Sequence, residues 1–279
     1  MSEFEKLKVV TRYELLKQFR RKRFYGALAI TVLAIFLTIG LYKGLDLPEQ
    51  MQQSAIERMG LPDSPELFAI FVTSMGSLAI LGAVFFAGDS IASEFESKTG
   101  YILFPNPVKR ITLVVGKYLA CFIATATILI IAYLISAGAL LWFYGQVPIG
   151  ILGSLAIALM LACCVISMAF AFSSVLKGGM GATIATLLTF MVISSIISMS
   201  LAYAGYDPWF MPDRAGDAVS ATYGISLEEM TGATYGGAPA MGGMAQASQD
   251  PTLSFFVLLA YAIILFQVSI WVTKRREMI

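Results

Sequence analysis

The chain has 279 residues, of which 58% are hydrophobic and only 13% charged, and its mean hydropathy is +0.77. A soluble domain carries about 25% charged residues, so this composition excludes an ordinary soluble protein and favours one that lies in a lipid bilayer. The formal net charge is only +1, which gives no reason to expect a nucleic acid as a partner. The chain has no histidine, so the commonest general base and the usual Cys/His metal sites are excluded too.

Residues 1–23 form a strongly basic segment at the start of the chain. They include eight Lys and Arg residues and no Gly or Pro, so we expect a helix. Its last four residues, Arg20, Arg21, Lys22 and Arg23, precede an apolar run and are predicted to lie at the level of the lipid head groups. The apolar residues do not gather on one clean face. Two alternatives stay open: a helix on the inner membrane surface, or a topology signal bound to anionic lipid.

Long runs without charge predict where the chain crosses the membrane, because a helix needs about 20 mainly apolar residues to do so. The run between Lys117 and Lys177 is too long for one crossing, and turn residues at 144–148 interrupt it. The fold class expected is all-α, a polytopic membrane protein with six transmembrane helices. The expected spans are about 24–42, 67–88, 113–143, 149–176, 180–205 and 252–273.

The distribution of Lys and Arg predicts the orientation, since basic residues stay on the cytoplasmic side. With the N-terminus inside, sixteen of the nineteen basic residues are cytoplasmic, and only Lys43, Arg58 and Arg214 lie outside. The outer segments instead contain eleven of the eighteen acidic residues. We therefore expect a multi-pass protein of the cell (plasma) membrane with a cytoplasmic N-terminus, a cytoplasmic C-terminus and an extracytoplasmic loop over 207–250.

The expected spans carry no ionisable residue near the middle of the bilayer. Asp89 and Lys117 lie at span ends, and Lys117 is expected to reach the head groups by snorkelling. Ion-driven carriers usually need deep charges, so this pattern argues against a channel or an ion-driven carrier.

The polar residues within the spans offer no catalytic site. The hydroxyls of the fifth span are predicted to make hydrogen bonds between helices rather than a substrate path. The cysteines Cys121, Cys163 and Cys164 lie in apolar runs and are predicted to pack as small apolar residues. No metal site, protease pair or phosphate loop is found in the sequence. The chain is therefore not expected to be an enzyme, and the energy for any uphill transport must come from elsewhere.

The cytoplasmic segment 94–110 carries the most specific pattern and reads EFESKTGYILFPNPVKR. An apolar cluster on a cytoplasmic loop usually marks an interface. The alternative is a loop that places its aromatic residues in lipid. The apolar cluster consists of Tyr101, Ile102, Leu103 and Phe104.

Together with Gly116-Lys117, this segment resembles the hallmark of the type 2 ABC exporter permeases, which reads E-x-E-x-G-T, a short apolar stretch, P-V-x-R and then G-K. The matching positions are Glu94, Glu96, Thr99, Leu103, Pro107, Val108 and Arg110. Lys98 replaces the usual glycine and Gly100 follows the threonine instead, which leaves the start of the coupling helix open.

The resemblance implies that this segment docks on a separate ABC ATPase subunit, present in two copies, and that the permease pairs with a second copy of itself or a related permease. ATP and magnesium are then expected on the ATPase, with no cofactor in this chain. It also implies that 1–23 is an elbow helix. The residues implied in coupling are Glu94, Glu96, Thr99, Gly100, Tyr101, Ile102, Leu103, Phe104, Pro107 and Arg110.

The sequence says less about the outer loop and about the transported substrate. The resemblance implies short re-entrant helices in 207–250, and the Gly- and Met-rich second half of this loop is flexible by composition, with copper(I) binding by its Met residues as a weaker alternative. No residue identifies the transported substrate. The alternative function is a membrane scaffold or assembly factor that only holds a cytoplasmic partner.

Overall fold

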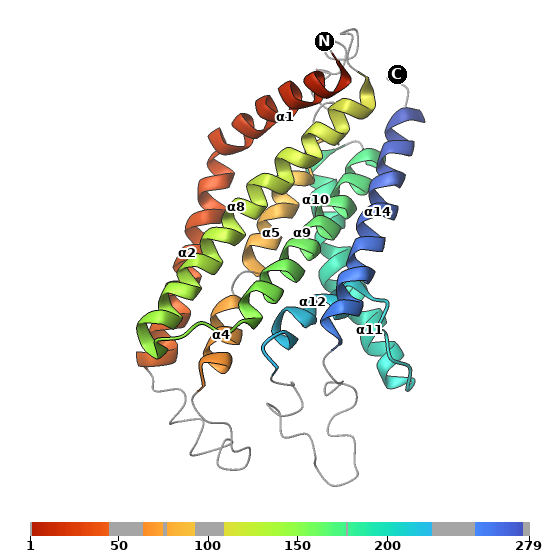
Figure 1. Cartoon of the computed structure of the whole chain (residues 1–279). Helices are drawn as coiled ribbons and strands as arrows, with labels where there is room; N and C mark the ends of the chain where they lie inside the picture. The colour runs from red at the N-terminus through yellow and green to blue at the C-terminus, as the bar shows by residue number, and fades with distance from the viewer. Residues whose placement is uncertain are drawn as a thin grey trace.

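The computed structural model describes residues 2–44, 64–74, 77–92, 109–176, 178–224 and 249–275. In these ranges the chain forms helices and no strands (Figure 1). The helices are α1 Glu3–Arg20, α2 Lys22–Gly44, α4 Pro65–Ser74, α5 Ser77–Ala87, α8 Arg110–Tyr144, α9 Gly150–Val175, α10 Gly179–Leu187, the π-helix η2 Leu188–Ile193, α11 Ser194–Tyr203, α12 Pro212–Ala221 and α14 Pro251–Arg275.

Among the described residues, five helical stretches are long and apolar enough to cross a membrane. They coincide with five of the six expected spans. The five stretches are Lys22–Gly44, Ile111–Tyr144, Gly150–Val175, Gly179–Tyr203 and Pro251–Arg275. The remaining expected span, 67–88, coincides with α4 and α5, which follow one another from one end of the bundle to the other (Figure 1). Each of these helices is too short to cross alone, so the sixth span stays a prediction.

Helix α8 is longer than a membrane crossing requires. Its 35 residues extend about 50 Å at about 1.5 Å per residue, against a hydrocarbon core of about 30 Å. It ends at Gly145, whose φ of 69° is left-handed and whose N–H donates to the carbonyl of Leu141. This confirms the turn expected at 144–148. The first part of α8 lies beside α1.

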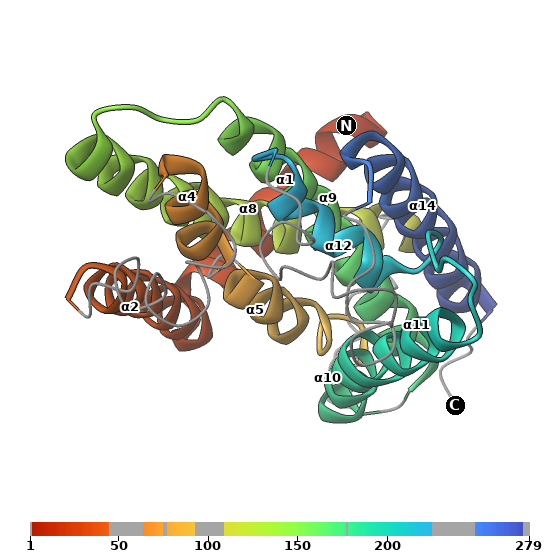
Figure 2. The same ribbon diagram turned by 90° about the horizontal axis from the view of Figure 1, so that it is seen from below.

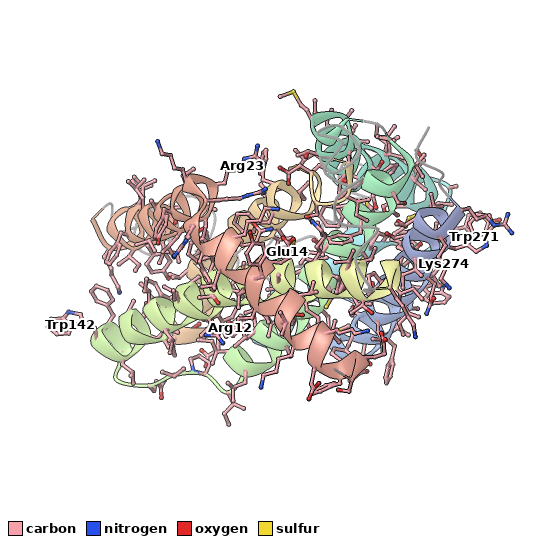
Figure 3. All side chains as sticks on the ribbon, turned by 90° about the horizontal axis from the view of Figure 1, so that it is seen from above. Arg12, Glu14, Arg23, Trp142, Trp271 and Lys274 are labelled. Atoms are coloured by element: carbon pink, nitrogen blue, oxygen red, sulfur yellow. The ribbon has the colours of Figure 1, made fainter. Side chains whose placement is uncertain are left out.

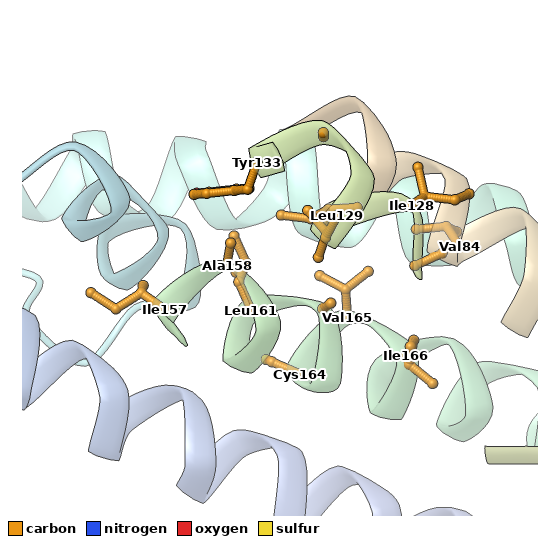
Figure 4. Close-up of a cluster of buried hydrophobic side chains, with 14 of the residues drawn as sticks. Val84, Ile128, Leu129, Tyr133, Ile157, Ala158, Leu161, Cys164, Val165 and Ile166 are labelled. Carbon is orange, nitrogen blue, oxygen red and sulfur yellow. The ribbon is translucent and has the colours of Figure 1, made fainter. Parts of the chain in front are cut away.

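Helix α9 lies at the centre of the bundle and contacts α14, α8, α12, α5 and α10. Figure 4 shows its buried side chains, among them Leu161 and Val165, facing Leu129 and Tyr133 of α8. Small residues such as Ala158 let the helices approach closely, which is how helices pack in lipid. All three cysteines are free, with Cys121 and Cys164 buried and Cys163 partly buried.

The two ends of the bundle differ. The start of α1 and the end of α14 lie at the same end (Figure 1), which we call the terminal end. Helix α12 crosses the opposite end without spanning the bundle, while α2 and the α10–α11 stretch stand at its periphery (Figure 2). The resemblance implied short re-entrant helices in 207–250, and α12 is a short helix within that range. Pro212 at its first turn is a favourable helix start.

Candidate functional site

Most of the expected coupling segment lies outside the described residues. This applies to nine of the ten residues implied in coupling, namely Glu94, Glu96, Thr99, Gly100, Tyr101, Ile102, Leu103, Phe104 and Pro107. Arg110 opens α8, and Lys109 precedes it as the N-cap residue. The structure therefore describes the chain as it enters the segment, up to Ala92, and as it leaves the segment at Lys109.

The basic N-terminal segment folds as the sequence predicts, with α1 starting in a capping box. The backbone N–H of Glu5 donates to Ser2 Oγ at 3.2 Å, and that of Ser2 donates to Glu5 Oε2 at 2.8 Å. Arg21 interrupts the helix with an extended backbone, and α2 begins at the next residue. Helix α1 is thus a separate arm joined to the first span at a sharp break.

Helix α1 packs against the first part of α8. Seen from above in Figure 3, the two helices cross, and Arg12 and Glu14 lie on opposite sides of α1. Gly116 of α8 makes the close approach possible, since a Cβ atom there would lie 2.6 Å from Cγ1 of Val10. This glycine therefore positions the side chains that α1 directs into the bundle.

An ion pair is buried between these two helices. Nζ of Lys117 lies 3.4 Å from Oε1 of Glu14, and the two side chains are 6% and 13% exposed. The same ammonium donates to the backbone carbonyl of Ser90 at 3.1 Å. Helix α1 covers this ammonium and supplies its counter-charge through Glu14. The expected position of Lys117 at the level of the head groups stays a prediction.

Neighbouring polar side chains extend this contact around the end of α5. The Ser90 hydroxyl donates to the carbonyl of Phe86 at 2.8 Å and lies 3.4 Å from the sulfur of Cys121. Gln18, the buried residue of α1, directs its amide nitrogen to the same carbonyl and the same sulfur, each at 3.4 Å. A polar cluster thus joins α1, α5 and α8 inside the protein.

Helix α9 contributes a further contact at the entry to the coupling segment. The backbone N–H groups of Ile91 and Ala92 both donate to Ser173 Oγ, at 3.1 and 2.9 Å. All three residues are buried. The hydroxyl thereby accepts hydrogen bonds from two buried backbone N–H groups that follow α5.

The junction of α1 and α2 holds Asp89, just before these residues. Nη1 of Arg23 lies 2.8 Å from Asp89 Oδ2, and Nη1 of Arg21 lies 3.4 Å from Oδ1. Two of the four expected interfacial arginines and lysines at 20–23 therefore contact protein. These pairs are partly exposed, so each contributes little to stability and mainly fixes position.

Residues 89–92 are consequently held by contacts from the α1–α2 junction, α8 and α9 at the terminal end of the bundle. Sequence reasoning singled out Lys117 and the arginines but missed Glu14, Gln18 and Ser173. A charged residue inside an apolar run indicates that a partner is needed. It does not identify the partner, which depends on how α1 packs. We call residues 89–92 with Glu14, Gln18, Lys117 and Ser173 the exit cluster.

Comparison with curated proteins finds no match. The family model described as ABC-2 family transporter protein matches residues 9–278, which includes every residue of the exit cluster and all five of the apolar stretches. The chain therefore belongs to the ABC-2 transporter family, as an integral membrane permease subunit.

Proposed function

We propose that this permease is the membrane-spanning half of an ATP-driven exporter, and that 94–110 is the coupling segment that receives movement from a separate ABC ATPase. The exit cluster is the observation that carries the proposal. Residues 90–92 enter the segment through buried hydrogen bonds to Lys117 and Ser173. Leaving such groups unpaired costs about 1–3 kcal/mol each. A displacement of the segment would therefore move α8 and α9 with it rather than break these contacts.

The proposed topology has six spans with both termini in the cytoplasm of the cell and the plasma membrane as location. The shared position of the α1 start and the α14 end supports it (Figure 1), as does the excess of Lys and Arg at that end. Tags at both termini should be protected in sealed right-side-out vesicles, whereas a tag near Met241 should be accessible. An accessible C-terminal tag would contradict six spans.

The proposed assembly contains two permease copies, identical or related, and two ATPase copies that bind ATP and magnesium. The α10–η2–α11 stretch supports a second permease, since only 11% of its most apolar 18 residues are buried inside this chain. A face of this kind needs lipid or another helix against it. Native mass measurement in lipid should show two permeases per particle, and monomers alone would contradict the pairing.

The coupling proposal is tested by changing Leu103 and Phe104 to Ala. Burying a large apolar side chain in an ATPase groove contributes about 1.5–3 kcal/mol, so removing two should weaken ATPase binding by about two to four powers of ten. Co-purified ATPase and transport in proteoliposomes should both fall, while membrane insertion stays normal.

A matched control changes Trp142 and Ile149 to Ala. These are also two large apolar residues, 84% and 90% exposed, at the opposite end of the bundle. The control should retain its ATPase. If the Leu103/Phe104 variant also kept a full complement of ATPase and normal transport, the segment would be a lipid-dipping loop instead. Retained ATPase binding without any ATP-dependent transport by the wild type would favour a scaffold.

A further inference from the structure

A cavity of about 230 Å³ lies between α12 and the helices of the bundle, toward the end opposite the exit cluster. Its walls come from α4, α5, α8, α9 and α12. Apolar side chains such as Ile70 and Leu161 form much of the lining, and Asp217 is the carboxylate that α12 contributes to it. We call this space the α12 cavity. It shares no residue with the exit cluster, so coupling does not account for it.

The hydroxyl groups of the lining act as acceptors. Thr73, Ser74 and Ser220 each donate their hydroxyl hydrogen to a carbonyl of their own helix, at 2.6, 2.7 and 2.7 Å. Their oxygen lone pairs remain the groups that a guest would meet, although Thr73 also accepts from Tyr223 at 3.3 Å. The hydroxyl of Tyr133 is already paired with Ser154 at 2.8 Å. The cavity thus presents acceptors rather than donors.

The carboxylate of Asp217 accepts no hydrogen bond from the residues that the structure describes. Asp217 lines the cavity and is an exposed residue. The protein atoms around the carboxyl nevertheless desolvate the charged form, which raises its pKa to about 6. The charge of Arg214 on the same helix opposes this rise and that of Asp213 adds to it. At neutral pH the group is therefore an anion without a hydrogen-bond donor among its described neighbours.

We propose that the α12 cavity binds a small organic ammonium ion. Asp217 is its counter-ion, the hydroxyl oxygens accept its N–H groups, and the apolar walls surround its hydrocarbon part. A lone carboxylate with several neutral oxygens suits an ammonium group, whose hydrogens are all donors. A hard metal ion needs about six oxygen ligands, and the described residues contain no cluster of three or more acidic, Cys or His side chains. The proposal does not depend on the exporter function.

The test measures binding of cyclohexylammonium to the purified full chain in lipid nanodiscs by equilibrium dialysis, with empty nanodiscs as the reference for partition into lipid. At pH 7.5 we expect saturable binding, and about ten-fold or weaker binding by the Asp217→Asn variant, because a charge-assisted hydrogen bond is lost. The neutral analogue cyclohexanol should bind no better to the wild type than to this variant. Asp207→Asn removes an exposed carboxylate outside the cavity and should leave binding unchanged.

Acidification supplies a second readout. Binding to the wild type should weaken as the pH falls through about 6, where Asp217 takes up a proton, whereas binding to Asp217→Asn should not follow this profile. Equal binding by wild type and Asp217→Asn, or uptake no greater than by empty nanodiscs, would overturn the proposal. Displacement of the probe by sodium or potassium at equimolar concentration would overturn the organic ligand class in favour of an inorganic cation.

Discussion

Lys117 Nζ lies 3.4 Å from Glu14 Oε1, and the two side chains that form this pair are almost completely buried. Lys17 also approaches the Glu14 carboxylate, at 3.7 Å, but its own side chain is 43% exposed. Glu14 thus depends chiefly on a partner in another helix. Removing one member of a buried pair is costly because the other charge stays buried without compensation.

The first prediction concerns this pair. Lys117→Met should lower the free energy of unfolding by about 3 kcal/mol, the lower end of the range for a broken buried pair, because Lys17 still neutralises part of the Glu14 charge. The double variant Glu14→Gln/Lys117→Met should be more stable than Lys117→Met alone. Denaturant unfolding in detergent, analysed as a double-mutant cycle, gives the coupling energy.

The exposed pair Lys6–Glu3 is the control for that cycle. Its atoms are 3.3 Å apart, but the side chains are 21% and 50% exposed. Its coupling energy should be only about 0–1 kcal/mol. Equal coupling energies for the two pairs would show that burial does not distinguish them.

The second prediction compares two glycines of α8. At Gly116 an added Cβ would lie 2.6 Å from Cγ1 of Val10, whereas at Gly138 no atom lies within 4 Å. Gly116→Ala should therefore destabilise the protein by about 1–3 kcal/mol through overpacking, and Gly138→Ala should stabilise it by about 0.5–1 kcal/mol. Thermal unfolding of the two variants in one detergent measures both. Stabilisation by Gly116→Ala would contradict the close packing of α1 on α8.

The third prediction concerns Ser173, which accepts the N–H groups of Ile91 and Ala92. Ser173→Ala leaves two buried donors unpaired, at about 1–3 kcal/mol each, so hydrogen exchange at these two amides should accelerate. Ser136→Ala is the control, because this buried hydroxyl donates to the carbonyl of Ala132 in its own helix. Unchanged exchange at Ile91 and Ala92 would exclude Ser173 as their partner.

The long apolar helices could be predicted from the sequence because one physical rule determines them. In lipid every backbone polar group must be paired internally, so long apolar runs such as 252–273 have to be helices. The turn after α8 was predictable because Gly145 tolerates the left-handed backbone that ends the helix. The expected span at 67–88 coincides with α4 and α5, and residues 75 and 76 between them lie outside the described ranges.

The exit cluster was less predictable, because each of its contacts joins segments far apart in the chain. The sequence places Lys117 at a span end and so favours a head-group position. Only the approach of α1 over Gly116 brings Glu14 close enough to bury the ammonium. Similarly, the hydroxyls of the fifth span, which include that of Ser194, were expected to make hydrogen bonds between helices. The Ser194 hydroxyl donates to Asp213 of α12 at 2.8 Å, a partner that depends on how the chain after the fifth span folds back.

The last prediction concerns the pH dependence of stability at Asp217. Its pKa rises from an ordinary value of 3.8 to about 6 on folding, because desolvation disfavours the charged carboxylate. The folded state therefore binds this proton more tightly than the unfolded chain does. The resulting stability is fully present below about 3.8 and is lost as the pH rises through about 6. The melting temperature of the wild type relative to Asp217→Asn should fall over this interval.

Asp250 provides a control of opposite sign. Its carboxylate accepts hydrogen bonds from the backbone N–H and the hydroxyl of Thr252, at 2.9 and 2.8 Å, and these bonds lower its pKa. Stability from Asp250 is present above its unfolded-state pKa and is lost as the pH falls through the lower folded-state value. The wild type should therefore lose stability relative to Asp250→Asn on acidification and gain it relative to Asp217→Asn. Parallel pH profiles for the two variants would contradict the assigned environment of Asp217.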